Sequence, residues 1–284
     1  KNILPAVVDK KDKPLFTPGP LTTSATVNEA MLRDLGSRDG EFIGVVKKIR
    51  ERLLKLAGVS QSQGWETVLM QGSGTFAIES VISSVTPPDG KWLVVINGAY
   101  GERLLKIIER HGFAVDAIRH AENELPDVAS IKSTLAKGGF THVAVVHCET
   151  TSGIMNPVAE IGTVVKAAGC VYFVDSMSAF GGVEFDLGVC EIDFLVSSAN
   201  KCIEGVPGFG FALCRREALQ STQGLARTLS LDLFDQWQAL EGNGQFRFTP
   251  PTHTLLAFAQ ALDELESEGG IPARARRYQA NHQA

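Results

Sequence analysis

The segment Val171–Gly210 constrains the fold most, because it contains two continuous apolar runs that each lead into a charged residue. The first run, Val171–Val174, is followed by Asp175, and the second, about Ile192–Ser198, leads to Lys201. Apolar runs without polar alternation are typical of strands buried on both faces of a parallel sheet. Because open α/β sheets bind ligands beyond the carboxyl ends of their strands, we expect Asp175 and Lys201 to share one site.

The rest of the chain alternates between short apolar runs and segments with helical spacing. This alternation predicts an α/β fold with a mostly parallel sheet sandwiched by helices. A long helix is expected from about His253 to Glu268, and the arginine-rich tail Pro272–Ala284 is expected to add no strand or core. The other predicted strands are Thr67–Met70, Trp92–Ile96, Thr141–Val146 and Phe209–Cys214, and a clear helical pattern runs from Phe42 to Leu56.

Composition excludes several classes of protein. The chain has 284 residues, 44% of them hydrophobic, which is enough for a large core. Its net charge of −5 and the lack of a basic run argue against nucleic acid as a partner. Five scattered cysteines without a CxxC pair predict reduced thiols, a cytoplasmic location and no metal site. No apolar run is long enough to span a membrane, so no membrane partner is expected.

Lys201 and Asp175 can together hold a flat cofactor that carries an aldehyde. A neutral lysine amine forms a Schiff base with an aldehyde, and the freed amine can then move a proton. A carboxylate at a buried strand end needs a cationic partner, which a protonated pyridine nitrogen supplies. We therefore predict that Lys201 carries pyridoxal phosphate and that Asp175 holds the ring nitrogen. The simpler interpretations are a surface lysine and an aspartate that caps the next turn.

The glycine-rich turn Gly72-Ser73-Gly74-Thr75 separates an apolar run from a predicted helix. Glycine lets the backbone approach an anion, and a helix start offers free N–H groups, so this turn can bind a phosphate. It is not a Walker loop, because no Lys-Ser or Lys-Thr pair follows. An ordinary helix cap at Ser73 or Thr75 explains the pattern equally well.

Further polar and aromatic residues follow other strands. Tyr100 can stack on a flat cofactor or belong to the core, and the hydroxyls of Thr150 and Thr151 can bond to a ring oxygen or lie in an ordinary turn. His147 fits a buried core histidine better than a catalyst.

Taken together, the motifs resemble those of the fold-type-I pyridoxal-phosphate aminotransferases of the alanine–glyoxylate group. Within that group they are most similar to the 2-aminoethylphosphonate–pyruvate transaminases. The resemblance extends from about Leu15 to Gly270. Its motifs are QGSGTFAIES, NGAYGER, HCETTSGIMNP, VDSMSAFGG, SSANKCIEGVPGFGF and RFTPPTH, with LFTPGPLTTS near the start.

The resemblance implies a homodimer that moves the amino group of 2-aminoethylphosphonate to pyruvate and gives phosphonoacetaldehyde and alanine. It also implies a role for each matching residue: Lys201 is the Schiff-base lysine, Asp175 the partner of the pyridine nitrogen, Ser73, Gly74 and Thr75 the phosphate contacts, Tyr100 the stacking ring, Thr150 the contact of the ring hydroxyl, and Thr249 a contact to the phosphate of the neighbouring subunit's cofactor.

The resemblance further implies a domain division. We expect an N-terminal arm at 1–17, a cofactor-binding large domain at 18–258 and the start of a largely absent C-terminal small domain at 259–284. The family's arginine for the acidic group of the substrate has no match here. Arg38 is either a second anion contact or a solvated surface residue.

Three alternatives to the aminophosphonate transaminase remain at this point. One is an alanine–glyoxylate or serine–pyruvate transaminase, and another is a truncated form that binds the cofactor with little turnover. The third is a cysteine desulfurase, against which Asn200 argues, because that class has a histidine before the lysine.

Overall fold

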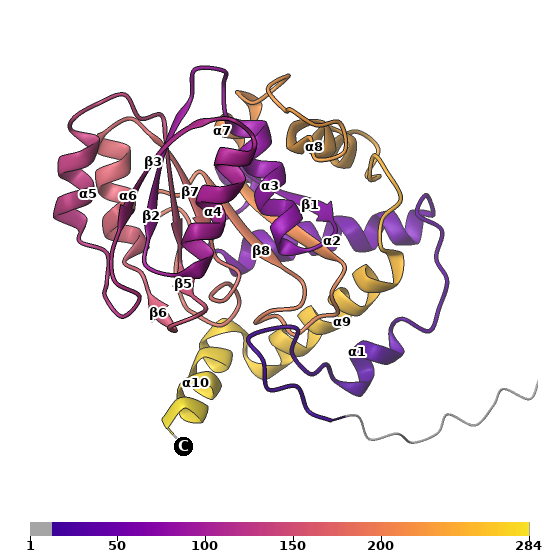
Figure 1. Ribbon diagram of the computed structural model, residues 1–284. Coiled ribbons are helices and arrows are strands. Elements are labelled where there is room, and N and C mark those ends of the chain that lie inside the picture. Colours follow the sequence, from indigo (N-terminus) through magenta and orange to yellow (C-terminus); the bar gives the residue numbers. More distant parts are fainter. Residues whose placement is uncertain (1–12, 284) are drawn as a thin grey trace, which may run out of the picture.

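The computed structural model describes residues 13–283, and Figure 1 shows a central sheet with helices packed around it. Within these residues the main sheet has seven strands in the order β1-β9-β8-β7-β4-β2-β3, and β9 alone runs antiparallel to its neighbours. The strands are β1 Trp65–Gln71, β2 Lys91–Ile96, β3 Ala114–Arg119, β4 His142–Val146, β7 Val171–Asp175, β8 Phe194–Ser198 and β9 Phe209–Arg215, with a separate pair β5 Cys148–Glu149 and β6 Ile154–Met155.

The middle of the sheet is covered on both faces. Every residue of β4 and of β8 is buried, including residues that point to opposite faces. Burial of alternate side chains on both sides requires helices above and below the sheet. The mostly parallel α/β sheet predicted from the sequence is therefore confirmed.

The helices follow the predicted apolar spacing where that spacing is clear. In α2 the side chains of Phe42, Val46, Ile49 and Leu53 are buried on one face, and the chain leaves the helix at Gly58, where φ is +76°. No helix in residues 13–283 is long and apolar enough to cross a membrane. The helices are α1 Ala25–Glu29, α2 Gly40–Leu56, the short 3-10 turn η1 Gln61–Gln63, α3 Gly74–Val85, α4 Ala99–Arg110, α5 Val128–Leu135, α6 Val158–Ala167, α7 Arg216–Gln220, α8 Leu233–Gly242, α9 Thr252–Glu268 and α10 Gly270–Gln283.

Two parts of the fold differ from the sequence prediction. The tail expected to lack a core is helix α10, which buries Ile271 and Arg274. Strand β3 was missed because it lies at the sheet edge, where only some of its residues are half-buried. The expected domain boundary between residues 258 and 259 falls inside α9, and residues 1–12 of the expected arm lie outside the described part.

The connections that carry the predicted chemistry gather at one edge of the sheet. Strands β1, β2, β4, β7 and β8 all run in the same direction, so their carboxyl ends share that edge. Ser73 follows β1, Tyr100 follows β2, Thr150 follows β4, Asp175 ends β7 and Lys201 follows β8. This is the edge at which open α/β sheets bind their ligands.

Candidate active site

A cavity of about 180 Å³ lies at this edge. Of the residues predicted to bind the cofactor, all except Thr150 and Thr249 line it. The lining residues are Ser73, Gly74, Thr75, Ile78, Tyr100, Arg103, Asp175, Met177, Ser198, Asn200 and Lys201.

Asp175 is buried, with 1% of its surface exposed, and it accepts one hydrogen bond, from the Met177 N–H at 3.0 Å. Burial raises the pKa of its carboxyl to about 6, against the opposing effect of the Met177 N–H. The nearby carboxylate of Glu149 raises this pKa further, while Arg103 and Lys201 lower it. A cationic N–H placed against Asp175 would supply the partner that its ionised form lacks.

Lys201 is half-buried, and burial lowers the pKa of its amine, although the charge of Asp175 opposes this effect. Gly19 lies against the lysine side chain with a φ of +147°. A Cβ on Gly19 would come within 2.6 Å of the lysine Cδ and 2.9 Å of Nζ. The loop around Gly19, to which the sequence assigned no contact with the site, therefore packs on the reactive amine.

The phosphate turn has the expected geometry. Ser73 is the N-cap residue of α3, but its side chain makes no capping hydrogen bond, so the hydroxyl stays available. The first N–H groups of a helix have no partner inside the helix, and they carry the positive end of its dipole. A Cβ on Gly74 would meet the Met177 sulfur at 2.4 Å, so only glycine lets the backbone line the cavity here.

Tyr100 opens α4, and Arg103 stands one turn further along. The guanidinium carbon of Arg103 lies 4.4 Å from the centre of the Tyr100 ring. Sequence reasoning missed Arg103. Its spacing of three residues from Tyr100 on one helix was the available signal, because such residues share a face.

Glu149 was also missed, although it is a fully buried carboxylate next to Thr150. Its two oxygens accept the backbone N–H groups of Tyr100 and Gly101, each at 3.3 Å. A Cβ on Gly98 would meet the Glu149 Cγ at 2.2 Å, so glycine leaves room for the carboxylate. Glu149 thus holds the start of α4 and with it the place of Tyr100.

Thr150 and His147 lie at the same edge but outside the cavity. The Thr150 hydroxyl is 2.7 Å from that of Ser178. His147 is buried, its Nδ1 lies 3.0 Å from the Ser176 hydroxyl, and burial lowers its pKa to about 4. A neutral, hydrogen-bonded histidine in this position fits the interpretation as a core residue.

Thr249 and Arg38 are both exposed and line a different cavity, of about 350 Å³. The structure does not bring either residue to Lys201 within this chain.

The Aminotransferase class-V family model matches residues 22–284 of the chain. The chain belongs to the class-V aminotransferases. It is 52% identical over 271 residues to a protein of Bacillus cytotoxicus named 2-aminoethylphosphonate–pyruvate transaminase, a match that covers 95% of this chain and 74% of that protein.

Solved aminotransferase structures have the same fold. Pyridoxamine–pyruvate aminotransferase from Mesorhizobium loti superposes with a TM-score of 0.85 at 26% identity, over 94% of this chain and 69% of the other. Alanine–glyoxylate aminotransferase from Nostoc sp. superposes with a TM-score of 0.86 at 24% identity, over 94% and 71% of the two chains. At this level of identity, the second likeness speaks for the fold alone.

Class-V aminotransferases use pyridoxal phosphate, and the cavity of this member fits that cofactor. The start of α3 offers N–H groups and free hydroxyls for a phosphate. Asp175 offers a buried carboxylate for a protonated ring nitrogen, and Lys201 offers an amine whose pKa is lowered. Among the described residues, none of the charged side chains that line the cavity takes part in an ion pair with the protein: Arg103, Asp175 and Lys201.

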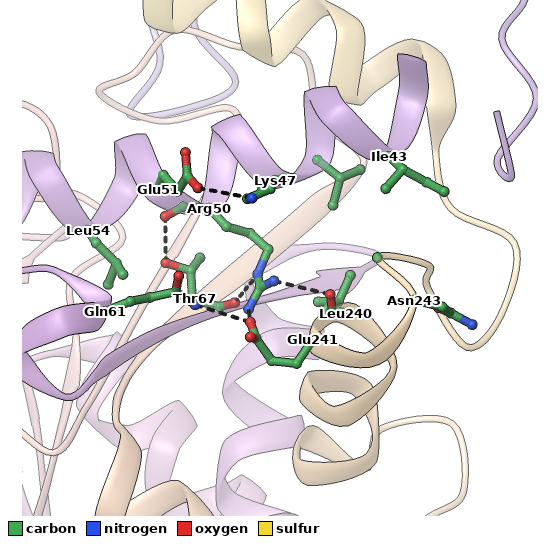
Figure 2. A pocket seen from close by; sticks show the side chains of 12 residues that line it. Ile43, Lys47, Arg50, Glu51, Leu54, Gln61, Thr67, Leu240, Glu241 and Asn243 are labelled. Carbon is green, nitrogen blue, oxygen red and sulfur yellow. Dashed lines mark hydrogen bonds and ion pairs between the residues drawn. The ribbon is translucent and has the colours of Figure 1, made fainter. Parts of the chain in front are cut away.

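A second cavity of this aminotransferase, of about 340 Å³, lies between α2, β1 and α8. Figure 2 shows Arg50 reaching from α2 toward Thr67 and Glu241. Its guanidinium donates to the carbonyls of Thr67 and Leu240 and pairs with Glu241. We call it the Arg50 cavity. Its charges are satisfied by the protein, so it lacks the unpaired groups that a reaction site needs.

Proposed function

We propose that this chain catalyses the transfer of the amino group of 2-aminoethylphosphonate to pyruvate, giving phosphonoacetaldehyde and L-alanine in phosphonate degradation. The observation that carries the proposal is the 52% identity, over 95% of the chain, to a protein named for this reaction. The cavity at the carboxyl edge supplies the groups that a transaminase needs.

Lys201 and Asp175 have separate roles in the proposed reaction. When bound, pyridoxal phosphate supplies an aldehyde for the amine and a ring that takes up an electron pair. Lys201 attaches the cofactor through Nζ, and its freed amine takes the proton from the substrate carbon beside the nitrogen. Asp175 keeps the ring nitrogen protonated, because its buried carboxylate is stable as an anion only beside a cation. Glu149 fixes the start of α4 and with it Tyr100, whose ring would stack on the cofactor.

The remaining residues place the two anionic groups. Ser73, Gly74 and Thr75 hold the cofactor phosphate at the start of α3. Arg103 adds a positive charge to the cavity, which favours a doubly charged phosphonate substrate. The Thr150 hydroxyl lies at the same sheet edge outside the cavity, where its bond to Ser178 orients it, and it would be the contact of the cofactor's ring hydroxyl.

We infer a cytoplasmic homodimer in which Thr249 reaches the cofactor phosphate of the partner subunit. Thr249 is exposed, and it lines a groove together with Phe76 and Phe248, whose exposed fractions are 53% and 44%. Exposed apolar side chains of this size are typical of protein interfaces. A second copy of the chain is the occupant that this proposal requires.

Amine specificity is tested by a half-reaction without pyruvate. The purified protein is loaded with pyridoxal phosphate and mixed separately with 2-aminoethylphosphonate, alanine, serine and glutamate, and its visible absorbance is followed. We expect 2-aminoethylphosphonate and alanine to bleach the visible band, because each is an amino donor in one direction of the reaction. A band that responds to serine or glutamate but not to 2-aminoethylphosphonate would reject the proposed substrate and leave the transaminase class intact.

A further inference from the structure

Helix α10 is joined to the segment that carries Lys201 by a cluster of charged side chains. That segment, residues 199–205 and here called the lysine loop, follows β8 and turns tightly. The N–H of Glu204 donates to the Lys201 carbonyl at 2.7 Å, and the N–H of Gly205 donates to the Ala199 carbonyl at 2.9 Å. Glu204 has a φ of +64°, a left-handed conformation that is uncommon for a residue with a side chain. Such a turn persists only where its surroundings hold it.

Arg274 of α10 contacts the backbone of the residue that follows Lys201. Its side chain is buried, and Nη1 donates to the carbonyl of Cys202, the residue after the lysine, at 2.5 Å. Nε donates to Glu268 at 2.8 Å, and Nη2 lies 3.8 Å from a carboxylate oxygen of Glu204. One buried guanidinium thus connects the backbone of the lysine loop to the end of α9.

Two further residues of α10 hold the side chain of Glu204. Arg277 donates to it at 2.9 Å, and the Tyr278 hydroxyl donates to it at 3.0 Å. Arg277 also donates to Glu268 at 2.7 Å, which closes the network. Figure 1 shows α10, in yellow, directly after α9. We name these side chains the α10 clamp: Glu204, Glu268, Arg274, Arg277 and Tyr278.

We propose that the α10 clamp positions Lys201, with Arg274 and Glu204 as its central residues. The clamp fixes the carbonyl after Lys201 and the left-handed turn three residues later, and so limits the directions in which the lysine can enter the cavity. A misplacement of about 1 Å can slow a reaction by about 100-fold. The α10 clamp can therefore affect the reaction rate although none of its residues contacts the reacting atoms. The inference rests on Lys201 as the cofactor lysine, but not on which amine is the substrate.

Hydrogen exchange on the protein without cofactor tests the clamp directly. Arg274→Lys keeps the positive charge but cannot bridge the Cys202 carbonyl and two carboxylates. We expect the amides of Glu204 and Gly205 to exchange about tenfold faster or more, because a hydrogen bond from a charged donor is lost. The amides of β8 should exchange as in the wild type. The matched control is Arg276→Lys, since Arg276 is exposed on the same helix and has no ion pair within residues 13–283.

The second measurement is the rate at which borohydride-fixed pyridoxal phosphate accumulates on Lys201, as a function of pH. In Arg274→Lys we expect this rate to be about tenfold lower and its pH midpoint to shift, while Arg276→Lys keeps both. If Arg274→Lys does not fold, Glu204→Gln carries the same two measurements, with smaller expected changes.

Wild-type exchange in the lysine loop of a folded variant would overturn the inference. Exchange that rises equally in β8 would also overturn it, because that result means general destabilisation. A protein whose clamp variants behave as expected but which does not respond to 2-aminoethylphosphonate would reject the proposed function alone.

Discussion

Two cavities of this protein, one around Arg50 and one around Lys201, both contain acidic and basic side chains, but only the first pairs them. In the Arg50 cavity the guanidinium is hydrogen-bonded to two carbonyls and paired with Glu241, and Lys47 pairs with Glu51. In the Lys201 cavity, Asp175 accepts one backbone hydrogen bond and has no ion pair among the described residues. Charges arranged to stabilise a fold are satisfied by the chain, whereas charges arranged for a reaction are left for a ligand.

The difference is also visible in the pKa values. Burial displaces the pKa values of Asp175 and Lys201 toward their neutral forms. For Lys201 this is the direction that an attacking amine requires, whereas Asp175 needs a bound cation to stabilise its ionised form. Buried charges without a protein partner lower the stability of the folded protein when no ligand is bound. Removing the central cation should therefore cost much more stability in the Arg50 cavity than in the Lys201 cavity.

The largest expected effect is on stability, when the central cation of each cavity is removed in a separate variant. Arg50→Met breaks a buried ion pair, because Arg50 Nη2 also lies 3.6 Å from the buried carboxylate of Glu66. We expect the free energy of unfolding to fall by about 3 kcal/mol, the lower end for such a pair, since Glu66 keeps Arg216 as a partner at 2.7 Å. Lys201→Met removes a charge without a protein partner, and should change the stability of the protein without cofactor by less than about 1 kcal/mol. Urea unfolding of both variants measures the difference. Equal losses in the two variants would contradict the comparison.

The next effect is a pH dependence of stability that belongs to Asp175. Its pKa of about 6 in the folded protein lies above the value of about 3.9 in an unfolded chain, so the folded state binds the proton more tightly. The stabilisation is complete below about pH 4 and is lost as the pH rises to about 6. Without cofactor, the wild type should lose up to about 3 kcal/mol relative to Asp175→Asn over this range.

The matched experiment adds the cofactor. With pyridoxal phosphate bound, the ionised carboxylate has a cationic partner, so the difference between wild type and Asp175→Asn should no longer fall between pH 4 and 6. His147 and His142 titrate alike in both proteins and cancel in the comparison. An Asp175→Asn variant that follows the wild-type curve without cofactor would show that Asp175 is already satisfied by the protein.

The smallest effect comes from crowding the amine. In Gly19→Ala the added methyl group meets the end of the Lys201 side chain, and the φ of +147° disfavours alanine. We expect cofactor attachment to slow by about tenfold as the amine moves aside. Gly40→Ala is the control, because nothing lies within 4 Å of its Cβ. Equal attachment rates in the two variants would show that the space at Gly19 does not affect the Lys201 amine.

The parts of the site that could be predicted are those marked by the local sequence on either side of each residue. Asp175 and Lys201 directly follow apolar runs, and Ser73 lies in a glycine turn before a helix, so local pattern placed them at one sheet edge. Glu149 and Arg103 were missed because their importance depends on what folds against them. A glutamate after a strand is ordinary until the start of α4 is placed over it.

The fold shows the same division. The buried strands were found because both of their faces are apolar, whereas β3 at the sheet edge carries polar residues and lacks that pattern. The tail Pro272–Ala284, most of which forms helix α10, was expected to add no core because its sequence is polar and rich in arginine. Its order follows from Arg274 and Arg277, which reach Glu204 and Glu268, and such pairs are visible only in three dimensions.

The most direct test of the central claim is the chemical identity of the residue that binds pyridoxal phosphate. The purified protein is incubated with the cofactor, reduced with borohydride and digested, and the labelled peptide is identified by mass spectrometry. We expect a visible band and a label on the peptide that contains Lys201, with both lost in Lys201→Ala and retained in Arg50→Met. A label on another lysine, or an unchanged visible band in Lys201→Ala, would contradict it.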